Sequence, residues 1–186
     1  MKQKIPENRM IIFSYYLFLM ASMVYVLILK KDQSFLLINS FHNPFFNDAF
    51  RLITMLGDGV VVVVFCIVLG LFKLRYFLLT ILSYLLSGLF VQILKRWVFS
   101  ELHRPLGYFN SQGIEIYTIP EVNVHLYHSF PSGHTASAFA LFFCLAFLSK
   151  KIIWKFFFLL LAILVGYSRI YLAQHFPSDV MAGSLI

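Results

Sequence analysis

Charged residues are scarce in this sequence: they make up 12% of its 186 residues, and only 8 of them are Asp or Glu. Soluble domains contain about 25% charged residues. The composition therefore excludes a soluble globular domain, a disordered chain and a nucleic-acid-binding protein. Glycine (9) and proline (6) are too few for a collagen-like repeat. The two cysteines, Cys66 and Cys144, lie inside apolar runs and form neither a disulfide framework nor a metal-ligand spacing.

Apolar residues are abundant instead. They make up 60% of the chain, aromatic residues make up 18%, and the mean hydropathy is +0.82. These values predict an integral membrane protein whose fold is all-α, a polytopic bundle of transmembrane helices forming one domain over residues 1–186. The formal charge of +7 does not by itself indicate an anionic partner, because basic residues also anchor the ends of membrane spans.

Long apolar intervals between basic residues predict the spans. Four intervals are each about 20 residues long, or about 30 Å of helix, which matches the hydrocarbon thickness of a bilayer. A shorter run, 60–72, is expected to extend back through Gly57-Asp58-Gly59 toward Phe50 as one span, and a sixth span begins near Pro177 and is incomplete at Ile186. The four long intervals are 9–30, 75–95, 131–150 and 151–169.

The basic residues near the span ends indicate an inside N-terminus. Four of the outer cations belong to the polar motifs described below or adjoin them and are set aside: Lys95, Arg96, Arg104 and Arg169. Three remain outside: Lys30, Lys31 and Arg51. The inner segments hold eight: Lys2, Lys4, Arg9, Lys73, Arg75, Lys150, Lys151 and Lys155.

Pro131-Ser132-Gly133-His134 precedes an apolar run and is typical of a helix start. Free backbone N–H groups at such a start bind anions, Gly133 permits close approach, and the Ser132 hydroxyl can donate a further hydrogen bond. A capped helix with an interfacial histidine is the alternative interpretation.

A second polar motif is Ser168-Arg169, five residues, His175, three residues, Asp179. Asp179 can orient His175 and leave its other nitrogen free as base or nucleophile, while Arg169 offers a planar fork for phosphate oxygens. A snorkelling arginine and a local helix cap are the alternatives. Lys95, Arg104 and Pro105 lie on the same predicted face. Together these cations and two histidines favour covalent phosphoryl transfer, in which one histidine attacks phosphorus and the other protonates the leaving oxygen.

The two motifs resemble the second and third signatures of the type 2 phosphatidic acid phosphatase superfamily in residues and in internal spacing. The first signature of that family is Lys, six residues, Arg-Pro. Arg104-Pro105 fits it, but eight residues separate Lys95 from Arg104, and Trp97 occupies the usual lysine position.

This resemblance implies that His175 is the nucleophile, held by Asp179, and that His134 is the general acid. It implies that Lys95, Arg104, Ser132, Gly133 and Arg169 bind the phosphate oxygens, and that no metal or organic cofactor takes part.

The resulting expectation is a metal-independent phosphatase that removes phosphate from a membrane lipid at the outer face, with the lipid and the bilayer as its partners. Candidate substrates are undecaprenyl diphosphate, lipid A, phosphatidic acid and phosphatidylglycerol phosphate. The short chain indicates a bacterial inner-membrane enzyme with its site facing the periplasm. A lipid-linked phosphotransferase and a non-enzymatic anion- or lipid-binding membrane protein are the alternatives.

Overall fold

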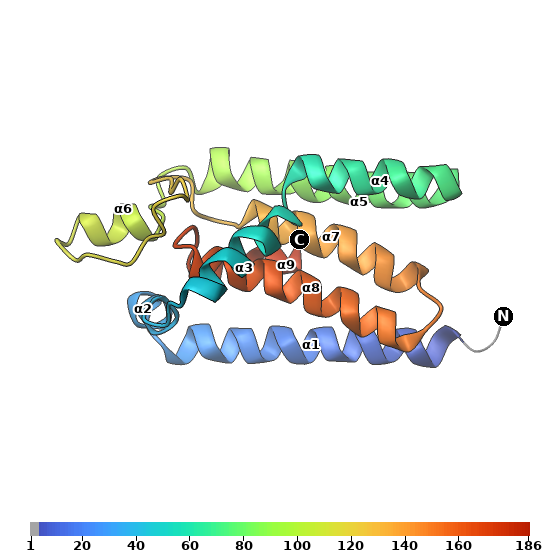
Figure 1. Ribbon diagram of the computed structural model, residues 1–186, viewed down its shortest axis with the longest axis horizontal. Coiled ribbons are helices and arrows are strands. Elements are labelled where there is room, and N and C mark those ends of the chain that lie inside the picture. Colours follow the sequence, from blue (N-terminus) through green and yellow to red (C-terminus); the bar gives the residue numbers. More distant parts are fainter. Residues whose placement is uncertain (1–3) are drawn as a thin grey trace.

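The computed structural model describes residues 4–186, and side chains from residue 8 onward; Lys2, used above for orientation, lies outside this range. Helices and connecting loops form the described chain, and no strand occurs in it, which confirms the predicted all-α class. Figure 1 shows the longest helices running side by side along the molecule. They are α1 (Lys4–Ile28), α4 (Gly59–Phe72), α5 (Leu74–Ile93), α7 (Gly133–Leu148) and α8 (Ile152–Tyr171).

Apolar side chains both fill the bundle and cover its outside. The core lies between α7, α8, α4 and α1, and includes Phe139, Phe142 and Val165. Outward-facing apolar residues remain exposed, such as Phe13 (69%) and Leu71 (81%). A large exposed apolar surface is expected where lipid, rather than water, surrounds the helices.

Three helical stretches are long and apolar enough to cross a bilayer: Asn8–Ile28, Leu74–Val98 and Ile152–Tyr171. They correspond to three of the predicted spans. The fourth, α7, is apolar but has only 16 residues, and α9 (Pro177–Leu185) has 9. The structure thus supports a transmembrane bundle, and the count of six spans stays a prediction.

The run 60–72, expected to extend back toward Phe50 as one span, is interrupted by a break, and the helices on its two sides pass together as one bent span by length and composition. Two helices, α3 (Pro44–Met55) and α4, meet there at a bend of 56°. Asp58 caps α4, because its Oδ1 accepts a hydrogen bond from the Val60 N–H at 2.8 Å. A capping residue has extended rather than helical backbone, so α3 cannot run on into α4.

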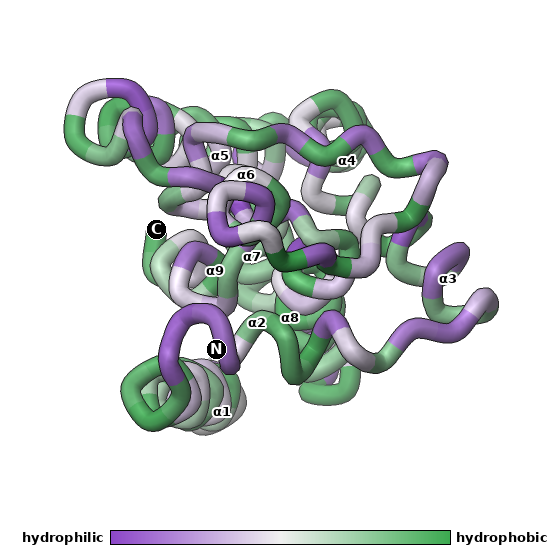
Figure 2. Tube along the Cα trace, turned by 90° about the vertical axis from the view of Figure 1, so that its left-hand side faces the viewer, coloured by the Kyte–Doolittle hydropathy of each residue, from purple (hydrophilic) through white to green (hydrophobic). Residues whose placement is uncertain are grey.

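One end of the bundle carries the short elements and most of the loops (Figure 1, left). Here lie α2 (Lys31–Asn39), α6 (Pro105–Asn110) and a π-helical turn, η1 (Leu94–Val98), that ends α5. Polar segments are frequent on this end, which faces the viewer in Figure 2. The first turns of α7 and α9 and the last turn of α8 also lie at this end, so the bundle gathers the predicted polar motifs in one place.

Candidate active site

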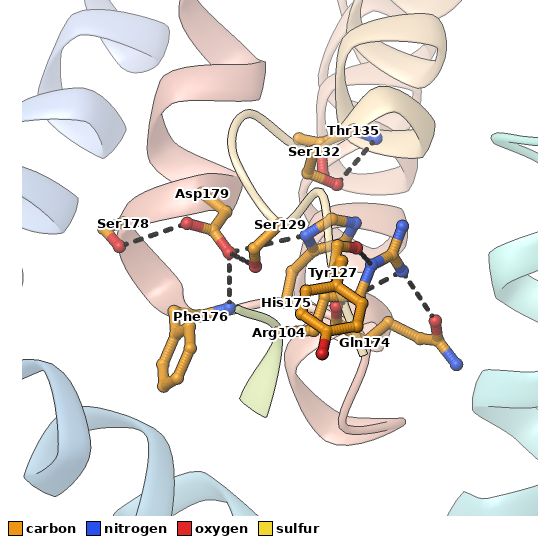
Figure 3. Close-up of polar contacts among 10 residues, drawn as sticks. All are labelled: Arg104, Tyr127, Ser129, Ser132, Thr135, Gln174, His175, Phe176, Ser178 and Asp179. Atoms are coloured by element: carbon orange, nitrogen blue, oxygen red, sulfur yellow. Dashed lines mark hydrogen bonds and ion pairs between the residues drawn. The ribbon is translucent and has the colours of Figure 1, made fainter. Parts of the chain in front are cut away.

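The first turn of α7 is built by its cap. Ser132 is fully buried, and its Oγ accepts hydrogen bonds from Oγ1 of Thr135 at 2.8 Å and from the Thr135 N–H at 3.5 Å. Its own N–H donates to the Asp179 carbonyl at 3.0 Å, which ties α7 to α9. The predicted helix start is therefore correct, but the Ser132 side chain points to Thr135 (Figure 3) and does not line the cavity described below.

His175 lies on the turn between α8 and α9 and Asp179 in the first turn of α9, and both are almost completely buried. Nδ1 of His175 is 3.4 Å from Oδ2 of Asp179. The same oxygen accepts hydrogen bonds from the Phe176 N–H at 2.9 Å and from Oγ of Ser129 at 2.5 Å (Figure 3). Asp179 thus caps α9 and also faces the imidazole, so the capping and the catalytic interpretations of the motif are compatible.

Two arginines converge on this turn. Nε of Arg104 donates to the Tyr127 carbonyl at 3.0 Å, and its Nη1 donates to Oε1 of Gln174 at 2.9 Å. Arg169 donates from Nη1 to Oγ1 of Thr54 at 2.7 Å. Its buried Nε has no hydrogen-bond partner among residues 4–186. Each guanidinium is fixed by protein groups on one side and has further donors for a phosphate.

Lys95 lies on the π-helical turn at the end of α5 and lines the cavity with Arg104 and Arg169. Trp97, at the usual family position, is 86% exposed and lies outside the cavity lining. π-Helical turns add a residue to a helix and shift the side chains that follow, and they are common at functional sites. This turn gives a physical reason why a lysine at a non-standard spacing reaches the site.

A cavity of about 540 Å³ joins these groups. Its size is within the range of ligand sites in proteins. Four cationic side chains contribute to its wall against one carboxylate, that of Glu121, so an anionic ligand is favoured. Of the predicted residues, the lining includes Lys95, Arg104, Gly133, His134, Arg169 and His175, whereas Ser132 and Asp179 are packed behind it.

The electrostatic environment keeps His175 neutral. Burial, and then the positive charges of Arg104, Lys95 and Arg169, lower the pKa of His175 well below its ordinary value. A neutral imidazole with one nitrogen facing a carboxylate has its other nitrogen free to act as a nucleophile.

Several site residues carried no signal in the sequence. Thr54 and Asp58 come from the α3–α4 break, where Thr54 holds Arg169 and the Asp58 carboxylate lies 4.0 Å from Nε2 of His134. Ser129 and Gln174 hold Asp179 and Arg104. The polar stretch Gly57-Asp58-Gly59 was visible in the sequence, but nothing in it indicated contact with the first turn of α7, far along the chain.

Comparison with known proteins places these features in a family. The model of the PAP2 superfamily matches residues 73–186, which is more than half of the chain. The match includes the three groups of cations and histidines described above, but not α3 or α4.

Curated relatives align over part of their length. The chain is 38% identical over 89 residues to "Bacitracin transport permease protein BcrC" of Bacillus licheniformis (46% of this chain, 43% of that protein). It is 35% identical over 82 residues to "Undecaprenyl-diphosphatase BcrC" of Bacillus subtilis (44% and 41%). It is 35% identical over 97 residues to "Lipid A 1-phosphatase" of Rhizobium etli (52% and 39%). The chain thus matches less than half the length of each.

Two solved structures share the fold over most of both chains. LpxE of Aquifex aeolicus superposes with a TM-score of 0.69 at 33% identity, covering 81% of this chain and 86% of that one. A transmembrane PAP2-type phosphatidylglycerolphosphate phosphatase from Bacillus subtilis gives a TM-score of 0.68 at 25% identity, covering 92% and 88%. With its helical membrane bundle and its buried His175–Asp179 pair, this chain belongs to the PAP2 superfamily.

Proposed function

We propose that this protein hydrolyses a phosphomonoester or diphosphate of a membrane lipid through a phosphohistidine intermediate. The observation that carries the proposal is the buried, neutral His175 beside Asp179, in a cavity whose cationic wall includes Lys95, Arg104 and Arg169. Cations and backbone donors fixed around a phosphoryl group stabilise the charge of its transfer, and a histidine nucleophile divides the reaction into two easier steps.

In the first step, Nε2 of His175 attacks phosphorus and the bond from phosphorus to the leaving oxygen breaks. His134, which lines the same cavity, gives its proton to that oxygen. In the second step, His134 takes a proton from water, the water oxygen attacks phosphorus, and the P–N bond breaks. Free phosphate leaves, and both histidines return to their starting forms.

The position of the site suits a substrate anchored in the bilayer. Figure 2 shows the end of the bundle at which polar segments are frequent. The residues that line the cavity lie at this end, where we expect the lipid headgroups. The proposed face is the outer one, the periplasmic side of a bacterial inner membrane, as the charge distribution predicts.

The names of the similar proteins support undecaprenyl diphosphate, lipid A and phosphatidylglycerol phosphate as the first substrates to test. Phosphatidic acid completes the set. All four present a phosphoryl group at the membrane surface.

The test is phosphate release from these four lipids by the purified protein in detergent, with a metal chelator present. We expect phosphate release from at least one lipid in the presence of the chelator. In His175→Ala the rate of this release should fall by at least about 10⁴-fold, since the nucleophile is removed. His103→Ala, which changes an exposed histidine outside the cavity, is the matched control. Phosphate transfer to another lipid or sugar hydroxyl, seen by mass spectrometry, would indicate a phosphotransferase. Lipid binding without turnover would indicate a binding protein.

A further inference from the structure

The break between α3 and α4 lies against the first turn of α7. Gly57 shows how close this contact is: a Cβ atom added there would lie 2.6 Å from the His134 carbonyl oxygen and 2.7 Å from Cγ1 of Val165. Only glycine allows the two backbones to approach this closely. The position of Asp58, the next residue, is therefore fixed relative to His134.

The two carboxylate oxygens of Asp58 face different partners. Oδ1 accepts the hydrogen bond from the Val60 N–H at 2.8 Å, which caps α4. Oδ2 lies 4.0 Å from Nε2 of His134. Both side chains are partly exposed, 48% for Asp58 and 35% for His134, which leaves the imidazole accessible from the cavity.

The remaining charges around His134 are positive. Burial, and then the charges of Arg169 on α8, Lys95 on η1 and Arg104 at the start of α6, lower the pKa of His134 to about 3. Asp58 opposes them by raising this pKa, and the neutral His175 lies in the same cavity. Cations disfavour the protonated form of a histidine, and a nearby carboxylate favours it. A histidine that must donate a proton in this environment needs a negative counter-charge, and Asp58 provides one.

We propose that Asp58 is a positioning residue for the chemical step, which favours the proton-donating form of His134 against the surrounding cations and turns it toward the leaving oxygen. This inference rests on the function proposed above. Asp58 lies before residue 73, where the match to the family model begins, so the family match assigns it no role. As the bond from phosphorus to oxygen breaks, the proton moves from His134 to the leaving oxygen; His134 becomes neutral and Asp58 keeps its charge.

The test compares Asp58→Asn with the unchanged protein on two substrates, phosphatidic acid and p-nitrophenyl phosphate. Asparagine is as good a helix cap as aspartate, so this variant removes the charge and keeps the cap of α4. The alkoxide that leaves phosphatidic acid needs a proton, whereas nitrophenolate leaves without one. General acid catalysis contributes about 10²–10⁴-fold, so we expect kcat on phosphatidic acid to fall by at least about tenfold, and kcat on the aryl phosphate by less than about threefold.

The pH profile gives a second readout, which a purely structural role would not change. The descending limb of kcat on phosphatidic acid should move about one pH unit lower in Asp58→Asn, since a tenfold change in proton affinity is one unit. Asp58→Glu restores the charge and should return the limb toward its original position. Glu115→Gln, which removes an exposed carboxylate outside the cavity, should change neither quantity.

Equal losses on the two substrates, or an unmoved pH limb, would overturn the proposal. If Asp58→Asn does not fold, Asp58→Ser keeps a capping oxygen without the charge and takes its place. If the unchanged protein does not hydrolyse phosphatidic acid, another lipid of the four that it does hydrolyse takes its place in this comparison. Absence of release from all four lipids would refute the proposed function itself, which distinguishes that failure from a failure of this inference.

Discussion

Replacing Asp179 by Asn separates its role as the cap of α9 from its electrostatic role beside His175. Three contacts of the carboxylate converge on Oδ2: hydrogen bonds from Oγ of Ser129 and from the Phe176 N–H, and Nδ1 of His175 at 3.4 Å, which does not form a hydrogen bond with it. The asparagine carbonyl can take the place of Oδ2 and keep them, while its amide faces Oγ of Ser178, which is 3.4 Å from Oδ1. The variant should therefore keep the cap of α9 and fold, but it loses the negative charge beside His175.

That charge should matter when His175 becomes a phosphorylated cation. At the 3.4 Å separation of Nδ1 and Oδ2, a unit charge contributes about 5 kcal/mol at an effective dielectric constant of about 20. Because solvent and neighbouring charges reduce this value, we expect kcat to fall by about 10³-fold, or about 4 kcal/mol. The melting temperature should fall by only a few degrees.

The assay measures phosphate release and, on a rapid timescale, acid-labile phosphate bound to the protein. Ser178→Ala, which changes a contact of the same carboxylate away from His175, is the control and should keep full activity. A kcat in Asp179→Asn within about tenfold of the unchanged protein would mean that Asp179 acts only as a helix cap, and the catalytic assignment would fail.

Two further changes probe the arginines. Thr54→Val removes the oxygen that accepts from Arg169 at 2.7 Å, so KM should rise by about tenfold while kcat changes little; an unaltered KM in steady-state kinetics contradicts this. Arg104→Gln removes one of the cations that, after burial, lower the pKa of His175. The pKa should rise toward its ordinary value, and the ascending limb of kcat/KM should move to higher pH; a limb that stays in place or moves lower rejects the electrostatic account.

The histidine motifs were predictable because their key contacts are local. His175 and Asp179 lie four residues apart across the start of α9, so their contact spans only one short stretch of chain. Ser132 likewise marks the first turn of α7 by its place before an apolar run. For Ser132 the sequence predicted the position and not the direction of the hydroxyl, since Thr135 competes for it.

Prediction from the sequence was incomplete where the structure depends on contacts between residues far apart in the chain. The run 60–72 was expected to extend back through Gly57-Asp58-Gly59 toward Phe50, and hydropathy alone does not register the 56° bend that interrupts it. Lys95 was predicted in spite of its spacing, and only the π-helical turn explains how it reaches the cavity.

The sequence by itself determined that the chain is a helical membrane bundle with two histidine motifs at one end, because composition, periodicity and short spacings act locally. Only the tertiary structure decided which groups complete the site. Thr54 meets Arg169 across 115 residues, and Asp58 meets His134 because α3 and α4 break where they cross α7 and α8. Such contacts depend on how closely whole helices pack, which small residues such as Gly57 permit but no local pattern specifies.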